Sequence, residues 1–136
     1  MARYLVTGGS GFVGAEIVAA LAARGDQSVA FDIRPSPRIE DLVAAHDGVS
    51  FVAGEIVEWA GIASIMKDFR PDAVVHCAAI VGVRASLDTP IQTMRVNVEG
   101  SLNVMEAMRL FGVRRMVHMS SEENYGHFQS DVVTED

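Results

Sequence analysis

The chain has 136 residues, of which 49% are apolar and 21% charged, a composition typical of one folded domain rather than of a disordered segment. Its formal net charge of −7 argues against nucleic acid as a partner, because no basic surface is available for phosphate backbones. A single cysteine excludes an internal disulfide framework and no apolar run approaches a membrane span, so the sequence predicts a cytoplasmic protein that does not enter a membrane.

Short β-rich runs alternate with longer helical patterns along the chain, which is typical of βαβ units and a parallel sheet. Apolar, valine-rich runs predict strands at Tyr4–Thr7, Ser28–Phe31, Phe51–Ala53, Ala73–His76 and Met116–Met119. Helices are predicted at Phe12–Arg24, Arg38–His46, Ile62–Phe69 and Ile91–Phe111. Gly25 and Gly112 stand where the first and last helix would end in a left-handed cap. We therefore expect one doubly wound α/β domain over residues 1–136, with strand order 3-2-1-4-5.

The last predicted helix carries more apolar surface than one face of a sheet needs. Two apolar stripes run along it at helical spacing, one through Ile91, Met94, Val98, Leu102 and Met105 and the other through Val96, Val104, Ala107 and Phe111. One stripe can cover the sheet, which leaves the other for a further helix or a partner chain. Complete burial of the helix is the alternative.

The segment TGGSGFVG, residues 7–14, stands between the first predicted strand and the first predicted helix. It fits two dinucleotide-binding patterns, one through Gly8, Gly11 and Gly14 and the other through Gly9, Gly11 and Gly14. In this context glycines let the backbone approach a pyrophosphate at the start of the helix. A tight structural turn without a ligand is the alternative.

An acidic residue ends the second predicted strand in the segment FDIR, residues 31–34. Asp32 can accept hydrogen bonds from an adenosine ribose and would repel a 2′-phosphate, which favours NAD over NADP. Arg34 weakens this preference, because an arginine there could receive the phosphate. A solvated turn carboxylate is the alternative interpretation of Asp32.

The chain resembles the extended short-chain dehydrogenase/reductase family, the NAD-dependent epimerases and dehydratases of nucleotide sugars. The resemblance rests on TGGSGFVG (7–14), FDIR (31–34), HCAA (76–79), NVEGSLNVMEAM (97–108) and HMSSEENYG (118–126), which occur in family order. It favours Thr7, Gly8, Gly11 and Gly14 as the pattern of the glycine loop. It implies an NAD cofactor, reversible hydride transfer on a secondary alcohol or ketone, a nucleotide-sugar substrate, and a homodimer formed through the helix Ile91–Phe111.

The resemblance also implies roles for single residues. Phe12 and Val13 would offer backbone N–H groups to the pyrophosphate, and Asn97 would support the site from the long helix. Ser121, the second serine of the SS pair, would act in catalysis by polarising the reacting oxygen. The cofactor-binding candidates, which include Glu55 where the family usually has aspartate, are Gly8, Gly11, Phe12, Val13, Gly14, Asp32, Ile33, Arg34, Glu55, Ile56, Ala78, Ala79 and Asn97.

The Tyr-x-x-x-Lys pair that carries the family's acid/base step is absent. Neither Tyr4 nor Tyr125 has a lysine four residues later, and the single lysine, Lys67, has no tyrosine four residues before it. We therefore expect no turnover from this chain and interpret it as the N-terminal, dinucleotide-binding part of a longer enzyme, without the later strands and the substrate domain. A complete, non-catalytic module that senses dinucleotide or docks to a partner is the alternative.

Two histidines and the cysteine could suggest a metal site. His76 and His118 end neighbouring predicted strands, but a metal site needs three or four convergent ligands. Cys77 lies in the apolar run AVVHCAA, where packing is a more common role than metal binding. We therefore expect no metal.

Overall fold

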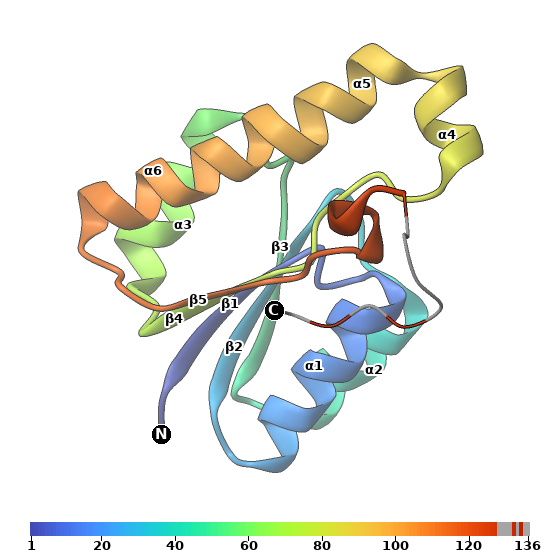
Figure 1. Ribbon diagram of the computed structural model, residues 1–136. Coiled ribbons are helices and arrows are strands. Elements are labelled where there is room, and N and C mark those ends of the chain that lie inside the picture. The colour runs from blue at the N-terminus through green and yellow to red at the C-terminus, as the bar shows by residue number, and fades with distance from the viewer. Residues whose placement is uncertain (128–131, 133, 135–136) are drawn as a thin grey trace.

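The computed structural model describes residues 1–127, 132 and 134, and its centre is a five-stranded parallel sheet (Figure 1). The strands are β1 (Arg3–Thr7), β2 (Gln27–Asp32), β3 (Val49–Ala53), β4 (Ala73–His76) and β5 (Met116–His118). They lie in the order β3-β2-β1-β4-β5. The predicted strand order is confirmed, and each predicted strand overlaps an observed one.

Helices cover both faces of this sheet (Figure 1). One face is covered by α1 (Phe12–Ala23) and α2 (Pro37–Ala45), the other by α3 (Trp59–Phe69) and α6 (Ser101–Phe111). Successive residues of a strand point to opposite faces, so Leu5 lies in the core below α3 and α6 while Val6 lies in the core below α1 and α2. Burial on both faces explains why the middle residues of β1, β2 and β4 are apolar. Among the described residues, no helix is long and apolar enough to cross a membrane.

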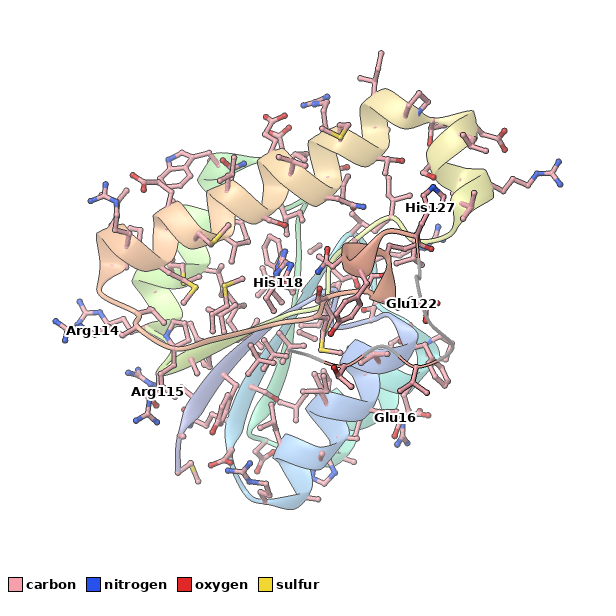
Figure 2. The ribbon with its side chains drawn as sticks, in the orientation of Figure 1. Glu16, Arg114, Arg115, His118, Glu122 and His127 are labelled. Carbon is pink, nitrogen blue, oxygen red and sulfur yellow. The ribbon has the colours of Figure 1, made fainter. Side chains whose placement is uncertain are left out.

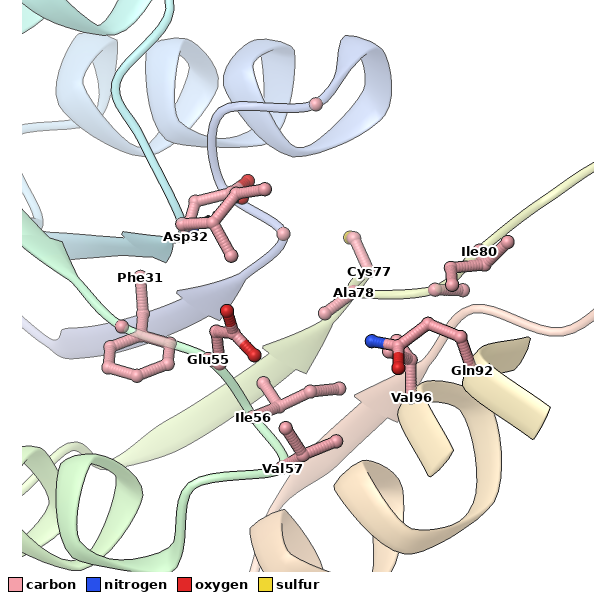
Figure 3. Close-up of a pocket in the computed structure, with 15 residues that line it drawn as sticks. Phe31, Asp32, Glu55, Ile56, Val57, Cys77, Ala78, Ile80, Gln92 and Val96 are labelled. Carbon is pink, nitrogen blue, oxygen red and sulfur yellow. Dashed lines mark hydrogen bonds between the residues drawn. The ribbon is translucent and has the colours of Figure 1, made fainter. Parts of the chain in front are cut away.

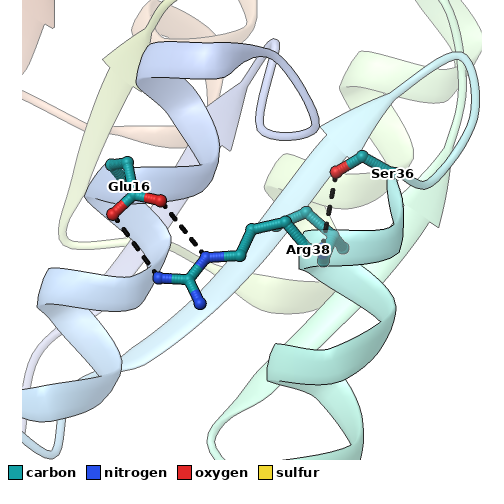
Figure 4. A network of polar contacts seen from close by, with 4 residues as sticks. Glu16, Ser36 and Arg38 are labelled. Carbon is teal, nitrogen blue, oxygen red and sulfur yellow. Dashed lines mark hydrogen bonds and ion pairs between the residues drawn. The ribbon is translucent and has the colours of Figure 1, made fainter.

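The first two helices are also joined by polar contacts (Figure 4). Arg38 of α2 donates to both carboxylate oxygens of Glu16 in α1, at 3.2 and 3.5 Å. Ser36 caps α2, since its hydroxyl oxygen accepts from the backbone N–H of Ile39 at 3.4 Å. Because the ion pair is exposed, it stabilises this packing by at most about 1 kcal/mol.

The predicted helix over Ile91–Phe111 is present as one continuous helical segment, but it is not α-helical throughout. The structure divides the segment into α5 (Pro90–Met94), a π-helical segment η1 (Arg95–Gly100) and α6, and a further short helix, α4 (Val83–Asp88), precedes them. The wide turn of η1 carries Asn97, whose side chain bonds both the N–H and the carbonyl oxygen of Ile80, at 2.8 and 2.9 Å. Gly100 lets the same segment approach Ile56 closely, because an added Cβ would lie 2.6 Å from that side chain. The departure from regular α-helix thus coincides with two long-range contacts.

One apolar stripe of this helical segment is left uncovered by the described residues. We call it the outer stripe; it is exposed at every position and consists of Ile91, Met94, Val98, Leu102 and Met105. On the opposite side, Val104 and Ala107 are fully buried against the core below α3. The expectation that one stripe covers the sheet and the other stays free agrees with the structure, except that Phe111, assigned to the inner stripe, is 41% exposed.

Two glycines end helices as predicted. Gly25 follows α1 and Gly112 follows α6, both with a φ of 75°. A positive φ is readily adopted only by glycine, which explains the choice of residue at both positions. After β5 the chain forms a 3-10 turn, η2 (Glu122–Tyr125).

Candidate functional site

The glycine loop joins β1 to α1 at the carboxyl edge of the sheet, where α/β proteins bind ligands. Gly8 has a φ of 67°, and a Cβ there would lie 2.6 Å from the backbone nitrogen of Ala78. A Cβ on Gly14 would lie 2.1 Å from the carbonyl oxygen of Gly8, so α1 packs directly on the loop. Gly9 faces β2, whereas Gly8 and Gly11 line a cavity. This arrangement favours the pattern through Gly8, Gly11 and Gly14.

The start of α1 is open to an anion. Its N-cap residue, Gly11, has no side chain to cap the helix, and its first turn holds no acidic residue. The first backbone N–H groups of a helix, which here belong to Phe12 and Val13, have no partner within the helix. With the positive end of the helix dipole they form a site suited to a phosphate or pyrophosphate. The side chain of Phe12 is 93% exposed, so this residue offers the site only its backbone.

Asp32 ends β2 and fixes the neighbouring loop. Its Oδ2 accepts from the backbone N–H of Ser10 in the glycine loop at 2.9 Å, and its Oδ1 accepts from the N–H of Ile33 at 2.8 Å. Each carboxylate oxygen keeps a further lone pair for a ligand hydroxyl. The carboxylate therefore both orders the loop and faces the cavity beside it.

A first cavity of about 390 Å³ lies between the ends of β1, β2 and β4 and the helical segment η1 (Figure 3). In Figure 3, Asp32 and Glu55 lie on one side of it, and Gln92 and Val96, which were not predicted, lie on the other. The cavity brings together these predicted cofactor residues: Gly8, Gly11, Asp32, Ile33, Glu55, Ile56, Ala78 and Ala79. The volume and the mixed lining suit the adenosine part of a dinucleotide.

A second cavity of about 780 Å³ adjoins the first. The two cavities share a wall, which we call the shared wall and which consists of Cys77, Ala78, Ala79 and Ile80. Val13, Asn97 and Ser121 line the second cavity. Because Asn97 holds both backbone polar groups of Ile80, it also fixes one end of the shared wall. Three predicted residues line neither of these cavities, namely Phe12, Gly14 and Arg34.

Ser121, the predicted catalytic residue, lies in this second cavity and is exposed. It caps η2, since its hydroxyl oxygen accepts from the backbone N–H of Glu123 at 3.3 Å. The neighbouring Ser120 accepts a hydrogen bond from Asn124. Ser121 can still donate its proton, so it can polarise an oxygen placed in the cavity.

A row of polar side chains crosses the sheet, buried at Thr7 and His76 and exposed at His118. Thr7, His76 and His118 are register partners on β1, β4 and β5. The ring of His76 is 2% exposed; its Nδ1 lies 2.6 Å from the hydroxyl of Thr7 and its Nε2 lies 3.0 Å from the hydroxyl of Ser101. The ring of His118 stacks on it with centroids 5.2 Å apart. Sequence reasoning missed this network, although polar residues ending two apolar strands were a visible signal.

The surroundings of His76 keep its ring neutral. Burial, with a smaller contribution from the charge of His118, lowers the pKa of His76 from 6.5 to about 4. Figure 2 shows His118 beside the sheet centre, at the opposite end of β5 from Arg114 and Arg115. Both ring nitrogens of His76 are engaged by uncharged hydroxyl groups, which also favours the neutral form.

We expect acidification to destabilise the protein through His76. The unfolded chain binds a proton at this residue below a pH of about 6.5, whereas the folded chain does so only near pH 4. The free energy of unfolding should therefore fall as the pH falls through this window, by about 2 kcal/mol from His76 between pH 7 and pH 5. Urea unfolding at several pH values measures the slope, and His76→Gln, which cannot titrate, should flatten it. Equal slopes in the two proteins would contradict the assignment.

The other candidate metal ligands do not converge. Within residues 1–127, 132 and 134, no group of three or more His, Cys, Asp and Glu side chains could hold a metal ion. Cys77 is half-buried in the shared wall, and burial raises the pKa of its thiol. Its uncharged thiol therefore serves as a packing group beside both cavities.

Comparisons with known proteins agree with this geometry. A sequence model of the NAD dependent epimerase/dehydratase family matches residues 4–136. A UDP-glucose 4-epimerase of Mycolicibacterium smegmatis is 40% identical over 88% of this chain and 38% of its own. A dTDP-glucose 4,6-dehydratase of Mycobacterium tuberculosis is 35% identical over 95% of this chain and 39% of its own.

The comparison with solved structures gives the same family. The crystal structure of a Thermus thermophilus UDP-glucose 4-epimerase in complex with NAD superposes with a TM-score of 0.74 and 35% identity, over 84% of this chain and 36% of that one. The chain thus spans roughly 40% of the length of these relatives. The matched region includes the glycine loop, the row of polar residues and the helical segment that carries Asn97.

Proposed function

The chain belongs to the NAD-dependent epimerase/dehydratase family, and from this premise we propose that its 136 residues form the dinucleotide-binding part of an oxidoreductase that acts on a nucleotide sugar. The observation that carries the proposal is the open start of α1 beside a cavity that holds Asp32. The pyrophosphate binds at the backbone N–H groups of Phe12 and Val13, between the two cavities. The adenosine occupies the first cavity, and the nicotinamide half and the reacting carbon of the substrate occupy the second.

The residues around the first cavity fit NAD better than NADP. The carboxylate of Asp32 accepts hydrogen bonds from ribose hydroxyls and repels a 2′-phosphate. Arg34, which could attract that phosphate, is exposed and does not line the cavity. Glu55 lines it, where it can accept a hydrogen bond from the amino group of adenine.

In the second cavity the chain supplies a polarising group but no acid/base pair. NAD supplies the hydride acceptor when it is bound. Ser121 donates a hydrogen bond to the oxygen of the reacting alcohol or ketone, and Asn97 holds the shared wall in place. Because no tyrosine precedes a lysine at a spacing of four, we propose that these 136 residues bind dinucleotide without turnover.

Calorimetric titration of the chain with NAD, NADH and NADP tests the proposal. We expect NAD to bind with a Kd of about 0.1 mM, NADP to bind at least about tenfold more weakly, and UDP-glucose to be left unchanged in the presence of NAD. Failure of all three dinucleotides to bind would refute the proposal. Tight binding that distinguishes NADH from NAD would instead favour a non-catalytic dinucleotide sensor.

We further infer that two copies of the chain associate through the outer stripe, which carries exposed apolar side chains along one continuous helical segment. Leu102→Glu places a charge at the middle of the stripe and should convert a dimer to a monomer in light scattering. Leu110→Glu makes the same change on the same helix, outside the stripe, and should leave the dimer intact. A monomeric wild-type chain at high concentration would contradict this prediction.

We also propose a cytoplasmic location. Cys77 is a free thiol that lines both cavities, and a thiol in that position is kept reduced in the cytosol.

A further inference from the structure

The imidazole of His76 joins three separate parts of the fold. Its Nδ1 lies 2.6 Å from the hydroxyl of Thr7, the residue that precedes the glycine loop, and its Nε2 lies 3.0 Å from the hydroxyl of Ser101 at the start of α6. Its face stacks on His118 of β5. Thr7, His76 and Ser101 are 0%, 2% and 6% exposed, so water does not compete for these bonds.

The hydrogen-bond directions in this network follow from one carbonyl group. The hydroxyl of Ser101 donates its only proton to the backbone carbonyl oxygen of Asn97, at 2.8 Å. It can therefore only accept from His76, so Nε2 carries the proton. Nδ1 is then an acceptor, and the hydroxyl of Thr7 donates to it. The network runs in one direction, from Thr7 through His76 and Ser101 to Asn97.

The two ends of this network belong to the two cavities. Thr7 leads into Gly8, which lines the first cavity, and Asn97 lines the second and holds Ile80 of the shared wall. A buried imidazole with two partners is stable only while both hydroxyl groups stay in place, because an unpaired buried polar atom costs about 1–3 kcal/mol. The ring therefore resists any change in the separation between the glycine loop and the turn that carries Asn97.

We propose that His76 is a positioning residue, which holds the glycine loop and Asn97 at the separation needed for one dinucleotide to occupy both cavities. This role rests on the proposed function. A residue that only packs in the core would affect all ligands alike. The positioning role instead predicts an effect on a ligand that spans both cavities and none on a ligand confined to the first. Loss of either hydroxyl partner should therefore weaken NAD more than it weakens ADP.

The affinities of the whole chain for NAD and for ADP test the role. ADP carries only the adenosine and diphosphate and needs the first cavity and the start of α1. In Thr7→Val and Ser101→Ala the ring is kept but one partner is lost, and we expect about tenfold weaker NAD binding with ADP affinity within about twofold of wild type. Thr7→Ser keeps the hydroxyl that Thr7→Val removes, so its NAD affinity should be close to that of wild type. Equal losses for NAD and ADP, or no loss for either, would overturn the positioning role.

A measurement without ligand tests the network itself. Imidazole ¹⁵N chemical shifts, assigned by comparison with His76→Gln, should show a neutral ring protonated at Nε2 from pH 7 to pH 5. A ring protonated at Nδ1 would overturn the proposal even if NAD binds. If the wild-type chain binds neither NAD nor ADP, both the proposed function and the positioning role are refuted. If the wild-type chain binds NAD but the variants lose NAD and ADP affinity equally, only the positioning role is refuted.

Discussion

Gly14→Ala is expected to abolish NAD binding and to lower the free energy of unfolding by about 3 kcal/mol, at the upper end for overpacked substitutions. A Cβ at this position would lie 2.1 Å from the carbonyl oxygen of Gly8 and 2.9 Å from Cα of Gly9. Both contacts are with backbone atoms, so no side chain can rotate away. Relief requires α1 to move off the loop, which would displace the N–H groups of Phe12 and Val13.

A control substitution at a second glycine distinguishes the effect of steric crowding from the effect of backbone strain. Gly25→Ala introduces the same methyl group where φ is 75° and no atom lies within 4 Å, so only the strain of a left-handed residue is added. We expect a loss of about 1 kcal/mol in the free energy of unfolding and unchanged NAD affinity. Chemical unfolding and calorimetry measure both quantities. If Gly14→Ala behaved like Gly25→Ala, the close packing of α1 on the loop would not be required for binding.

Asp32→Ala is expected to weaken NAD binding by about 30-fold, or about 2 kcal/mol, and to remove most of the preference over NADP. The substitution deletes the acceptor for the ribose hydroxyls and also the acceptor for the N–H of Ser10, so the glycine loop loses a support. NADP should lose less affinity, because the repulsion of its 2′-phosphate by the carboxylate disappears at the same time.

Two variants serve as controls for this result. Asp32→Asn keeps one oxygen acceptor in the same place, so NAD binding should be intermediate. Arg34→Ala changes a neighbouring charge that does not line the cavity, so NAD affinity should stay within about twofold of wild type. A Kd unchanged in Asp32→Ala, by calorimetry, would contradict the assignment of Asp32 to the ribose.

The strands and the glycine loop were predictable because local sequence determines both. A strand buried on two faces needs a continuous apolar run, and each of the five runs became a strand near its predicted ends. The loop needs glycine wherever a Cβ would meet backbone, as at Gly8 and Gly14. The helix ends at Gly25 and Gly112 follow from the same kind of local constraint.

What could not be predicted depends on contacts between distant residues. The π-helical turn carries Asn97, whose side chain bonds Ile80, and helical periodicity carries no signal for such a turn or such a partner. Gln92 was missed in the first cavity because its place there depends on how α5 lies over the sheet. The bonds of His76 to Thr7 and Ser101 likewise need the strand order and the position of α6.

The π-helical turn also affects how this segment can change in evolution. A turn of that kind holds about one residue more than an α-helical turn, and each residue of an α-helix advances about 100° around the axis. Deleting one residue of η1 other than Asn97 would therefore close the wide turn to a regular α-helix and leave Val104 and Ala107 on the face that packs on the sheet. A deletion within α6, which has no wide turn to absorb the loss, would rotate the residues after it by about that angle. We therefore expect single-residue deletions to be tolerated in the turn and excluded from α6.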